Sequence, residues 1–229
     1  PVLSMGIGWA ILDRGDIETC EPWFEWAQKL YDQCQVEPSR ETILVNDIDA
    51  FEQIPVSLMS AKAYLAAVKG DYAQLLEATQ ELRILAEKHV NKKLWIIDTF
   101  VATLLWGSGE LDGAIYHMMQ VKNGERGQIN PLMENSMVWV LAELYIQKGE
   151  LTHAKLLLEK AISDLQKDGV VPVVLATYYL YFGMIAMYRG EINQAYQWLD
   201  TSKTYGHRFE FMDWRYKYYA VKARLYILE

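Results

Sequence analysis

Two kinds of segment alternate along the chain. One kind is apolar on nearly every side, as in the run from Leu94 to Val101, and the other keeps charged residues on one side, as in 72–89. A helix that is apolar all round is covered by other helices on several sides, whereas an amphipathic helix turns its polar side to water. The pattern therefore predicts an all-α protein, with first helices in an inner layer and second helices in an outer, wetter layer.

A short turn joins each apolar segment to the amphipathic segment that follows it. Its clearest copy is Gly149-Glu150-Leu151, with Ala154 three positions further on. Glycine can take the left-handed conformation that ends a helix, and the acidic residue lies where the exposed N–H groups of the next helix begin. The turn recurs at Gly15, Gly70, Gly109, Gly149 and Gly190, although the residues that follow the glycine vary between copies. Five copies of one turn predict a repeat protein.

The spacing of these turns indicates the class of repeat. The last four glycines follow one another at intervals of 39, 40 and 41 residues, after a first gap of 55. A period near 40 is typical of a longer-helix relative of the 34-residue tetratricopeptide (TPR) repeat. Residues seven before each glycine are small: Gly8, Ala63, Ala102, Ala142 and Gly183. Residues twelve after it are small or apolar: Ala27, Leu82, Val121, Ala161 and Ser202.

These patterns together predict a right-handed α-α superhelix of TPR-like helical hairpins with about 11 helices. We expect first helices at 1–14, 56–69, 93–108, 131–148 and 172–189, second helices at 17–34, 72–89, 111–122, 152–167 and 192–204, and a half repeat at 211–229. The segment 35–54 lengthens the first connection, and Ile48 and Phe51 within it are expected to be buried. No long Gly/Ser linker interrupts the chain, so 1–229 is predicted to be a single domain, and the missing initiator Met suggests a piece of a longer protein.

Charge and cysteine content limit the possible binding partners and the cellular compartment. A net charge of −8 makes the chain as a whole a poor nucleic-acid binder. Cys20 and Cys34 have no CxxC spacing, and Cys20 occupies the small-residue position of the first turn, which favours packed free thiols in a reducing, cytoplasmic compartment. The uncharged stretch 169–188 is long enough for a membrane span, but Pro172 and Gly183 and the repeat register favour a buried first helix.

Two stretches carry a resemblance to a known family. They are Leu44–Pro55, leading into Ala63-Tyr64-Leu65-Ala66 and Gly70-Asp71, and Tyr205–Tyr216 followed by Ala223-Arg224-Leu225. They resemble the helical-repeat sensor region of the large ATP-dependent LuxR-type (MalT-like) transcriptional regulators. The resemblance implies an ATPase module before the repeats, a helix-turn-helix DNA-binding domain after them, and repeats that sense an inducer. Because the chain has no GxxxxGK[ST] loop, ATP is expected only in the upstream domain and DNA contact only through the downstream one, with no cofactor in this piece.

A ligand groove is predicted on the concave side, which first helices line in TPR geometry. Counting back from each glycine gives the candidate residues Trp9, Tyr64, Thr99, Thr103, Trp106, Trp139, Glu143, Met184 and Tyr188. Aromatic faces with a few hydroxyls suit sugars or other small amphipathic molecules. The alternative is that these side chains pack between repeats. Glu143 would then be a buried carboxylate bonded to a tyrosine of a neighbouring repeat, instead of an acceptor for a sugar hydroxyl.

Other sequence patterns give weaker indications of a functional site. Glu150 and His153 share a helix face, but no second histidine stands four positions away, so neither a metal site nor an enzyme is predicted. The tail from Lys203 to Arg224 is basic and aromatic, which fits either nucleic-acid binding or a last ordered helix with its Lys and Arg stems outward. Its uncovered apolar side predicts self-association. The expected function is an effector-sensing or protein-interaction superhelix whose partner is a small-molecule inducer or a regulatory protein. The alternative is a generic protein–protein scaffold without a ligand of its own.

Overall fold

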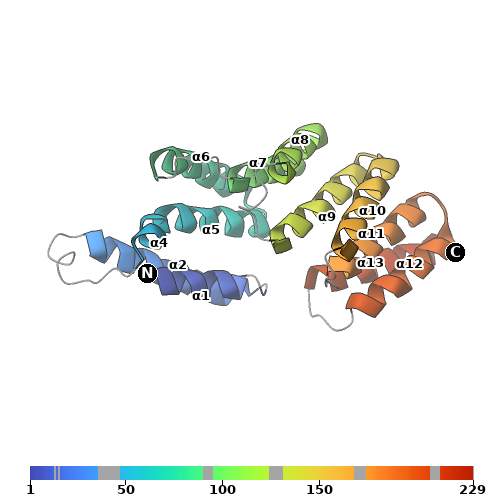
Figure 1. The fold of residues 1–229 in the computed structure, drawn as a ribbon, viewed down its shortest axis with the longest axis horizontal. Coiled ribbons are helices and arrows are strands. Elements are labelled where there is room, and N and C mark those ends of the chain that lie inside the picture. The colour runs from blue at the N-terminus through green and yellow to red at the C-terminus, as the bar shows by residue number, and fades with distance from the viewer. Residues whose placement is uncertain are drawn as a thin grey trace. The chain divides into compact units, whose positions relative to one another are not determined.

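The computed structural model describes residues 1–12, 14, 16–35, 47–89, 95–123, 131–167, 174–206 and 212–228. Throughout these residues every element of regular secondary structure is an α-helix (Figure 1). The chain divides into two compact units, Pro1–Glu110 and Leu111–Glu229, which are described separately. The prediction of one domain over 1–229 stays a prediction.

The first unit is built from two antiparallel hairpins and one further first helix. The helices α1 and α2 pack together, α5 packs on α6, and α7 packs on both α5 and α6. Their bounds are α1 Val2–Leu12, α2 Ile17–Gln35, α4 Ile48–Glu52, α5 Ile54–Lys69, α6 Tyr72–His89 and α7 Trp95–Gly107. Two cores result, one between the α1–α2 hairpin and α5, and one between α5, α6 and α7.

The second unit repeats the same arrangement. Hairpins form between α9 and α10 and between α11 and α12, while α8 packs on α9 and α13 packs on α11 and α12. Their bounds are α8 Leu111–Lys122, α9 Pro131–Gln147, α10 Leu151–Lys167, α11 Val174–Tyr188, α12 Ile192–Gly206 and α13 Met212–Leu228. The core is centred on α11, whose apolar sequence is buried along most of its length.

Four of the five predicted turns share one hydrogen-bond pattern. Gly70, Gly109, Gly149 and Gly190 have φ angles of 71°, 83°, 82° and 76°, in the left-handed region that glycine adopts without strain. In each turn the glycine N–H bonds the carbonyl three residues back, and the next N–H bonds the carbonyl five residues back, as from Glu150 to Tyr145 at 2.8 Å. This pair of hydrogen bonds is the Schellman motif, which supplies N–H donors to the last carbonyl groups of the ending helix. Gly15 lies outside the described residues.

The acidic residue after the glycine begins the next helix. Oδ1 of Asp71 accepts a hydrogen bond from the N–H of Gln74 at 3.0 Å, and Oδ1 of Asp16 accepts one from Thr19 at 3.2 Å. An N-cap side chain of this kind satisfies a backbone donor that the helix itself leaves unpaired. The interpretation of the acidic residue as the start of the next helix is therefore confirmed at Asp71 and Asp16.

Positions close to the turns are buried. The position five after each glycine has an exposed fraction of 0 % in all five copies: Cys20, Leu75, Ala114, Ala154 and Ala195. A Cβ added to Gly183 would lie 3.4 Å from the carbonyl oxygen of Ala195 and 3.3 Å from Cδ2 of Leu199. Because this spacing leaves little room for a side chain, packing favours a small residue at position 183.

The first connection differs from the prediction. It contains an additional short helix, α4, so the described chain has twelve helices instead of about eleven. Asp47 caps α4 by accepting from the N–H of Ala50 at 2.9 Å. Phe51 packs on Tyr31 with ring centroids 5.2 Å apart, but Ile48 is 61 % exposed, so the expectation that Ile48 is buried was wrong. Phe51 is half-buried, and α4 has no fully buried residue, so the expected burial of Phe51 is met only in part.

The remaining predicted helices begin and end within two residues of the observed ones. Stretch 169–188 supplies α11, the buried helix of a repeat, over the part that is described. Among the helices described here, none is long and apolar enough to cross a bilayer.

Candidate functional site

The predicted groove residues of the first unit form two groups. Trp9 on α1 meets Tyr64 on α5 edge to face, with ring centroids 6.2 Å apart, and its Nε1–H donates to Oγ of Ser57 at 3.1 Å. Trp9 also contacts Phe24 of α2. Trp9 is therefore used in packing, while Tyr64 remains exposed.

The second group lies on α7. Thr99 and Thr103 donate their hydroxyl hydrogens to carbonyls one turn back in the same helix, at 3.3 and 2.9 Å. A threonine bonded in this way keeps its oxygen lone pairs as acceptors but has no proton to offer a ligand. Both threonines and Trp106 are half-buried.

In the second unit, Glu143 of α9 is the centre of a polar network. Its Oε2 accepts from the hydroxyl of Tyr181 on α11 and pairs with Nζ of Lys217 on α13 at 2.5 Å. Nζ of Lys217 also donates to the Tyr181 hydroxyl at 2.8 Å and lies 5.1 Å from the ring centroid of Trp139. Three successive first helices are thus joined through one carboxylate. The hydrogen bond from Tyr181 is the one expected if Glu143 packs between repeats as a carboxylate bonded to a neighbouring tyrosine.

The other two candidates in this unit, Met184 and Tyr188, have different surroundings. Met184 is buried in the core around α11, and Tyr188 at the end of α11 is exposed. The Tyr188 hydroxyl accepts a hydrogen bond from Nη1 of Arg224 on α13 at 3.1 Å. Whether these nine residues bind a ligand stays a prediction.

Tyr181 and Lys217 were missed by the sequence prediction. The signal was present, because a carboxylate on the apolar helix α9 requires a donor or a cation, and the adjacent first helices are the nearest source. Counting positions from each glycine selects inward-facing residues one helix at a time and does not pair residues between helices.

A groove opens on the second-helix side of this unit, between α10 and α12 and floored by α11. Its volume is about 310 Å³. Its apolar part is aromatic: Tyr179 stacks on Trp198 with centroids 5.7 Å apart and planes 11° apart, and Phe182 stacks on Trp198 at 5.1 Å. The lining is completed by Lys155, Glu159, Ile162, Ser163, Ile185, Ala186, Arg189, Glu191 and Gln194.

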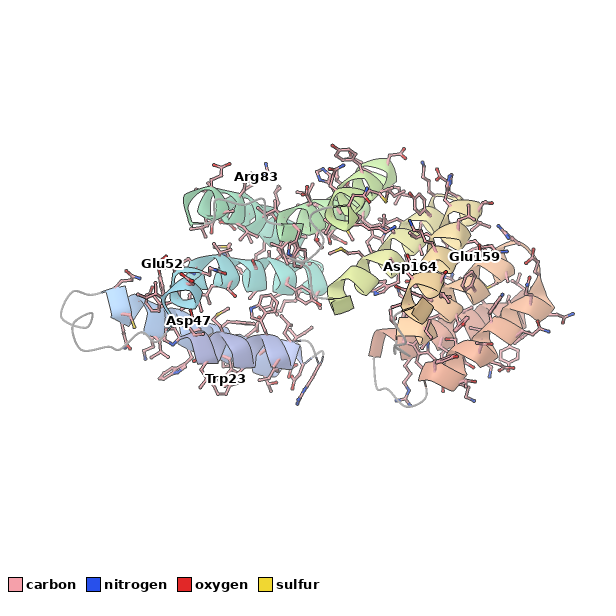
Figure 2. All side chains as sticks on the ribbon, in the orientation of Figure 1. Trp23, Asp47, Glu52, Arg83, Glu159 and Asp164 are labelled. Carbon is pink, nitrogen blue, oxygen red and sulfur yellow. The ribbon has the colours of Figure 1, made fainter. Side chains whose placement is uncertain are left out.

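The rim of this groove carries charges of both signs. Lys155 and Glu159 pair along α10 at 3.7 Å, and Nη2 of Arg189 donates to Oγ1 of Thr152 at 3.4 Å. Figure 2 shows Glu159 and Asp164 on α10. Burial, with a smaller contribution from Tyr205, raises the pKa of the Tyr179 hydroxyl, so it stays protonated and able to donate at neutral pH.

The sequence prediction placed the groove on the first helices alone and did not include these residues. Tyr179 and Phe182 stand three positions apart on one face of α11, and Trp198 stands eight residues after the turn at Gly190. This spacing places the three aromatic side chains between the two helices of one hairpin. Within the described residues, His, Cys, Asp and Glu form no group of three able to hold a metal ion.

Comparison with known proteins supports the fold and assigns no family. No family model matches the chain, and no curated protein matches its sequence. Among solved structures, the nearly identical TPR-like repeats of a kinesin light chain-like protein of Podosopora anserina align over 91 % of this chain and 95 % of that one, with a TM-score of 0.55 and 13 % identity. A point variant of the same repeats aligns over 90 % and 93 %, with a TM-score of 0.56 and 12 % identity. The predicted all-α, TPR-like fold is thereby confirmed.

Proposed function

We propose that the chain is a protein-interaction module that binds a segment of a partner protein in the groove between α10 and α12. The observation that carries this proposal is the aromatic floor of Tyr179, Phe182 and Trp198 beneath a rim charged with both signs. Aromatic residues are enriched at the centres of protein interfaces, and polar groups at their rims. A volume of about 310 Å³ lies at the lower end for small-molecule sites. It accommodates one or two anchoring side chains of a larger partner.

The rim defines the chemistry of the partner segment. Lys155 and Arg189 would pair with acidic residues, and Glu159 and Glu191 with basic ones. The partner segment accordingly carries an aromatic or long aliphatic anchor with charges of both signs close to it. Exposed rim charges contribute specificity and association rate more than affinity.

A peptide-display selection against the full chain tests this proposal. We expect the selected peptides to share an apolar anchor and to lose at least tenfold in affinity, measured by calorimetry, when Trp198→Ala removes the central ring. Trp23→Ala on α2 is the matched control, because Trp23 is exposed and lies in the other unit. Its affinity should equal that of the parent.

A second variant guards against a folding defect in Trp198→Ala. Glu191→Lys leaves the floor intact and should shift the charge preference of the selected peptides toward acidic residues. The proposal is overturned when Trp198→Ala and Glu191→Lys, both folded by circular dichroism, bind the selected peptides as the parent does.

A finer proposal concerns the protein to which this module belongs. We propose that it is the sensor region of a cytoplasmic LuxR-type (MalT-like) regulator, and the stretches around Leu44–Pro55 and Tyr205–Tyr216 support this. In that case the first-helix residues, with Trp139 and the exposed ring of Tyr64 among them, contact an inducer, and no reaction is assigned to the chain itself. Titration of sugars and metabolites followed by tryptophan fluorescence tests the inducer. An ATPase encoded upstream and a helix-turn-helix downstream would support the regulator, and other neighbours would contradict it.

A further inference from the structure

One ammonium group in the second unit is surrounded by a carboxylate, a phenol and two aromatic rings. Nζ of Lys217 on α13 lies 2.5 Å from Oε2 of Glu143 on α9 and donates to the hydroxyl of Tyr181 on α11 at 2.8 Å. It also lies 5.1 Å from the ring centroid of Trp139 and 5.4 Å from that of Tyr181. We call Trp139, Glu143 and Tyr181 the ammonium cage.

The components of the ammonium cage are those that recognise organic cations. An aromatic ring attracts a cation that lies over its face within about 6 Å of the centroid, and cages of aromatic side chains bind ammonium ligands in this way. The carboxylate and the phenol oxygen accept hydrogen bonds that a primary ammonium group can donate. Because the Tyr181 hydroxyl donates its own hydrogen to Glu143, its oxygen is available to accept from the cation.

The walls of the ammonium cage are held in place by α9 and α11, and α13 supplies only the cation. The ring of Tyr181 is fully buried, and its hydroxyl donates to Oε2 of Glu143. The other carboxylate oxygen of Glu143, Oε1, accepts from Nε2 of Gln147 one turn further along α9, at 3.5 Å. Both oxygens of Glu143 therefore have donors on α9 and α11 besides Lys217, so the site does not need the lysine to keep its shape.

The ammonium cage requires a cation, but the cation need not be a lysine of the same chain. The side chain of Glu143 is only 14 % exposed, and a carboxylate so far removed from water is costly unless a cation pairs with it. Lys217 is 27 % exposed and carries its ammonium at the end of a flexible four-carbon stem, which can turn out into water. Departure of Lys217 alone would leave Glu143 unpaired, whereas exchange for another cation keeps it paired.

We propose that the ammonium cage binds the primary ammonium group of a small aliphatic amine, which takes the place of Lys217. Lys217 is then an internal competitor, which lowers the affinity for the amine and excludes neutral molecules. A primary ammonium is preferred to a quaternary one, because only the primary group can donate to Glu143 and Tyr181. The cage shares no residue with the α10–α12 groove, and amine binding requires neither a partner in that groove nor a LuxR-type regulator.

The probe is the n-propylammonium ion, which is the fragment that Lys217→Ala removes from the side chain. We expect it to bind the Lys217→Ala chain and, at least tenfold more weakly, the parent chain. In both titrations the indole N–H signal of Trp139, assigned with Trp139→Phe, should shift and saturate in NMR spectra. Saturable binding to the parent is the decisive readout, because a lysine with a purely structural role would not yield its place to the ion.

Two further compounds test the chemistry of the site. The neutral molecule n-propanol has nearly the same size as the probe and should give no saturable shift in the parent or in Lys217→Ala. Tetramethylammonium carries the charge without N–H donors, and we expect it to bind Lys217→Ala at least fivefold more weakly than the probe does.

Variants of the chain locate the binding. Glu143→Gln, introduced into the Lys217→Ala chain, removes the negative charge and should weaken the probe at least tenfold. Lys222→Ala is the matched control, because Lys222 also lies on α13 with Nζ 5.8 Å from an aromatic centroid, that of Tyr226. The Lys222→Ala chain should bind the probe as the parent does. Circular dichroism checks that each variant is folded.

Three outcomes overturn the proposal. The first is a parent chain whose Trp139 signal shows no saturable response to n-propylammonium, and this measurement does not depend on the folding of any variant. The second is n-propanol binding as tightly as the ion. The third is an affinity of the Lys217→Ala chain that Glu143→Gln leaves unchanged.

Discussion

Nζ of Lys217 lies 2.5 Å from Oε2 of Glu143, although the two residues are 74 positions apart and belong to α13 and α9. Their side chains are 27 % and 14 % exposed, so the ion pair is largely removed from water. Tyr181 on the intervening helix α11 bonds both partners. Helix repeats usually stack through apolar contacts between neighbours. Here a polar network adds a contact that spans three first helices.

Breaking this network should destabilise the second unit. Lys217→Met leaves the carboxylate of Glu143 without its cation, and we expect a loss of about 1–3 kcal/mol in the free energy of unfolding, measured by urea denaturation. Arg215→Met on the exposed side of α13 is the control and should change stability by less than about 0.5 kcal/mol. The double variant Glu143→Gln, Lys217→Met should be less destabilised than the sum of its single variants. Additive effects would contradict the coupling.

The left-handed glycines should tolerate a methyl group poorly. Gly70→Ala forces a Cβ into a φ of 71°, and we expect a loss of about 1–2 kcal/mol in thermal or urea unfolding, even though nothing lies within 4 Å of that Cβ. Gly6→Ala is the matched control in the same unit. Gly6 lies inside α1, with open space around it, so this variant should be neutral or stabilising by up to about 1 kcal/mol. Equal effects at the two sites would mean that conformation at Gly70 is unimportant.

The turn at Gly149 predicts a pH effect. Lys148 lies 2.5 Å from Glu150 and holds the pKa of that carboxyl below its ordinary value of 4.5, with a smaller contribution from His153. Because the pKa is lower in the folded state, the stabilisation is present above the unfolded pKa and is lost as the pH falls through the folded one. Carboxyl chemical shifts followed by NMR should show Glu150 titrating late on acidification, and Lys148→Met should return it toward 4.5. A titration unchanged by Lys148→Met would exclude this pairing in solution.

Cys20 should be chemically protected. It is fully buried, its thiol donates to the carbonyl of Ile17 at 3.1 Å, and burial raises its pKa, with Glu21 contributing. Since the thiolate is the reactive form, a Cys34→Ser chain should react with a disulfide reagent at least about a hundredfold more slowly when folded than in urea. Because the pKa is higher in the folded state, the associated stability is fully present below the unfolded thiol pKa and is lost as the pH rises through the folded one. Rapid labelling of the folded chain at neutral pH would show that α2 opens locally.

The sequence by itself determined the helices and the turns that connect them. Glycine, an acidic residue and an apolar residue in succession specify a left-handed residue followed by a capped helix, and these are local interactions within six residues. The alternation of apolar and amphipathic segments separated the buried helices, such as α11, from their wetter partners. Both signals depend only on neighbours in the chain, so they can be read without coordinates.

Only the tertiary structure decided which side chains meet between helices. Glu143 was singled out from its position on an apolar helix, but its partners Tyr181 and Lys217 come from two other repeats. The groove of Tyr179, Phe182 and Trp198 lies on the side opposite to the one predicted for a ligand, because the aromatic stack forms between the two helices of a hairpin. Periodicity specifies the direction in which a residue points, but the neighbour it meets depends on how the helices pack.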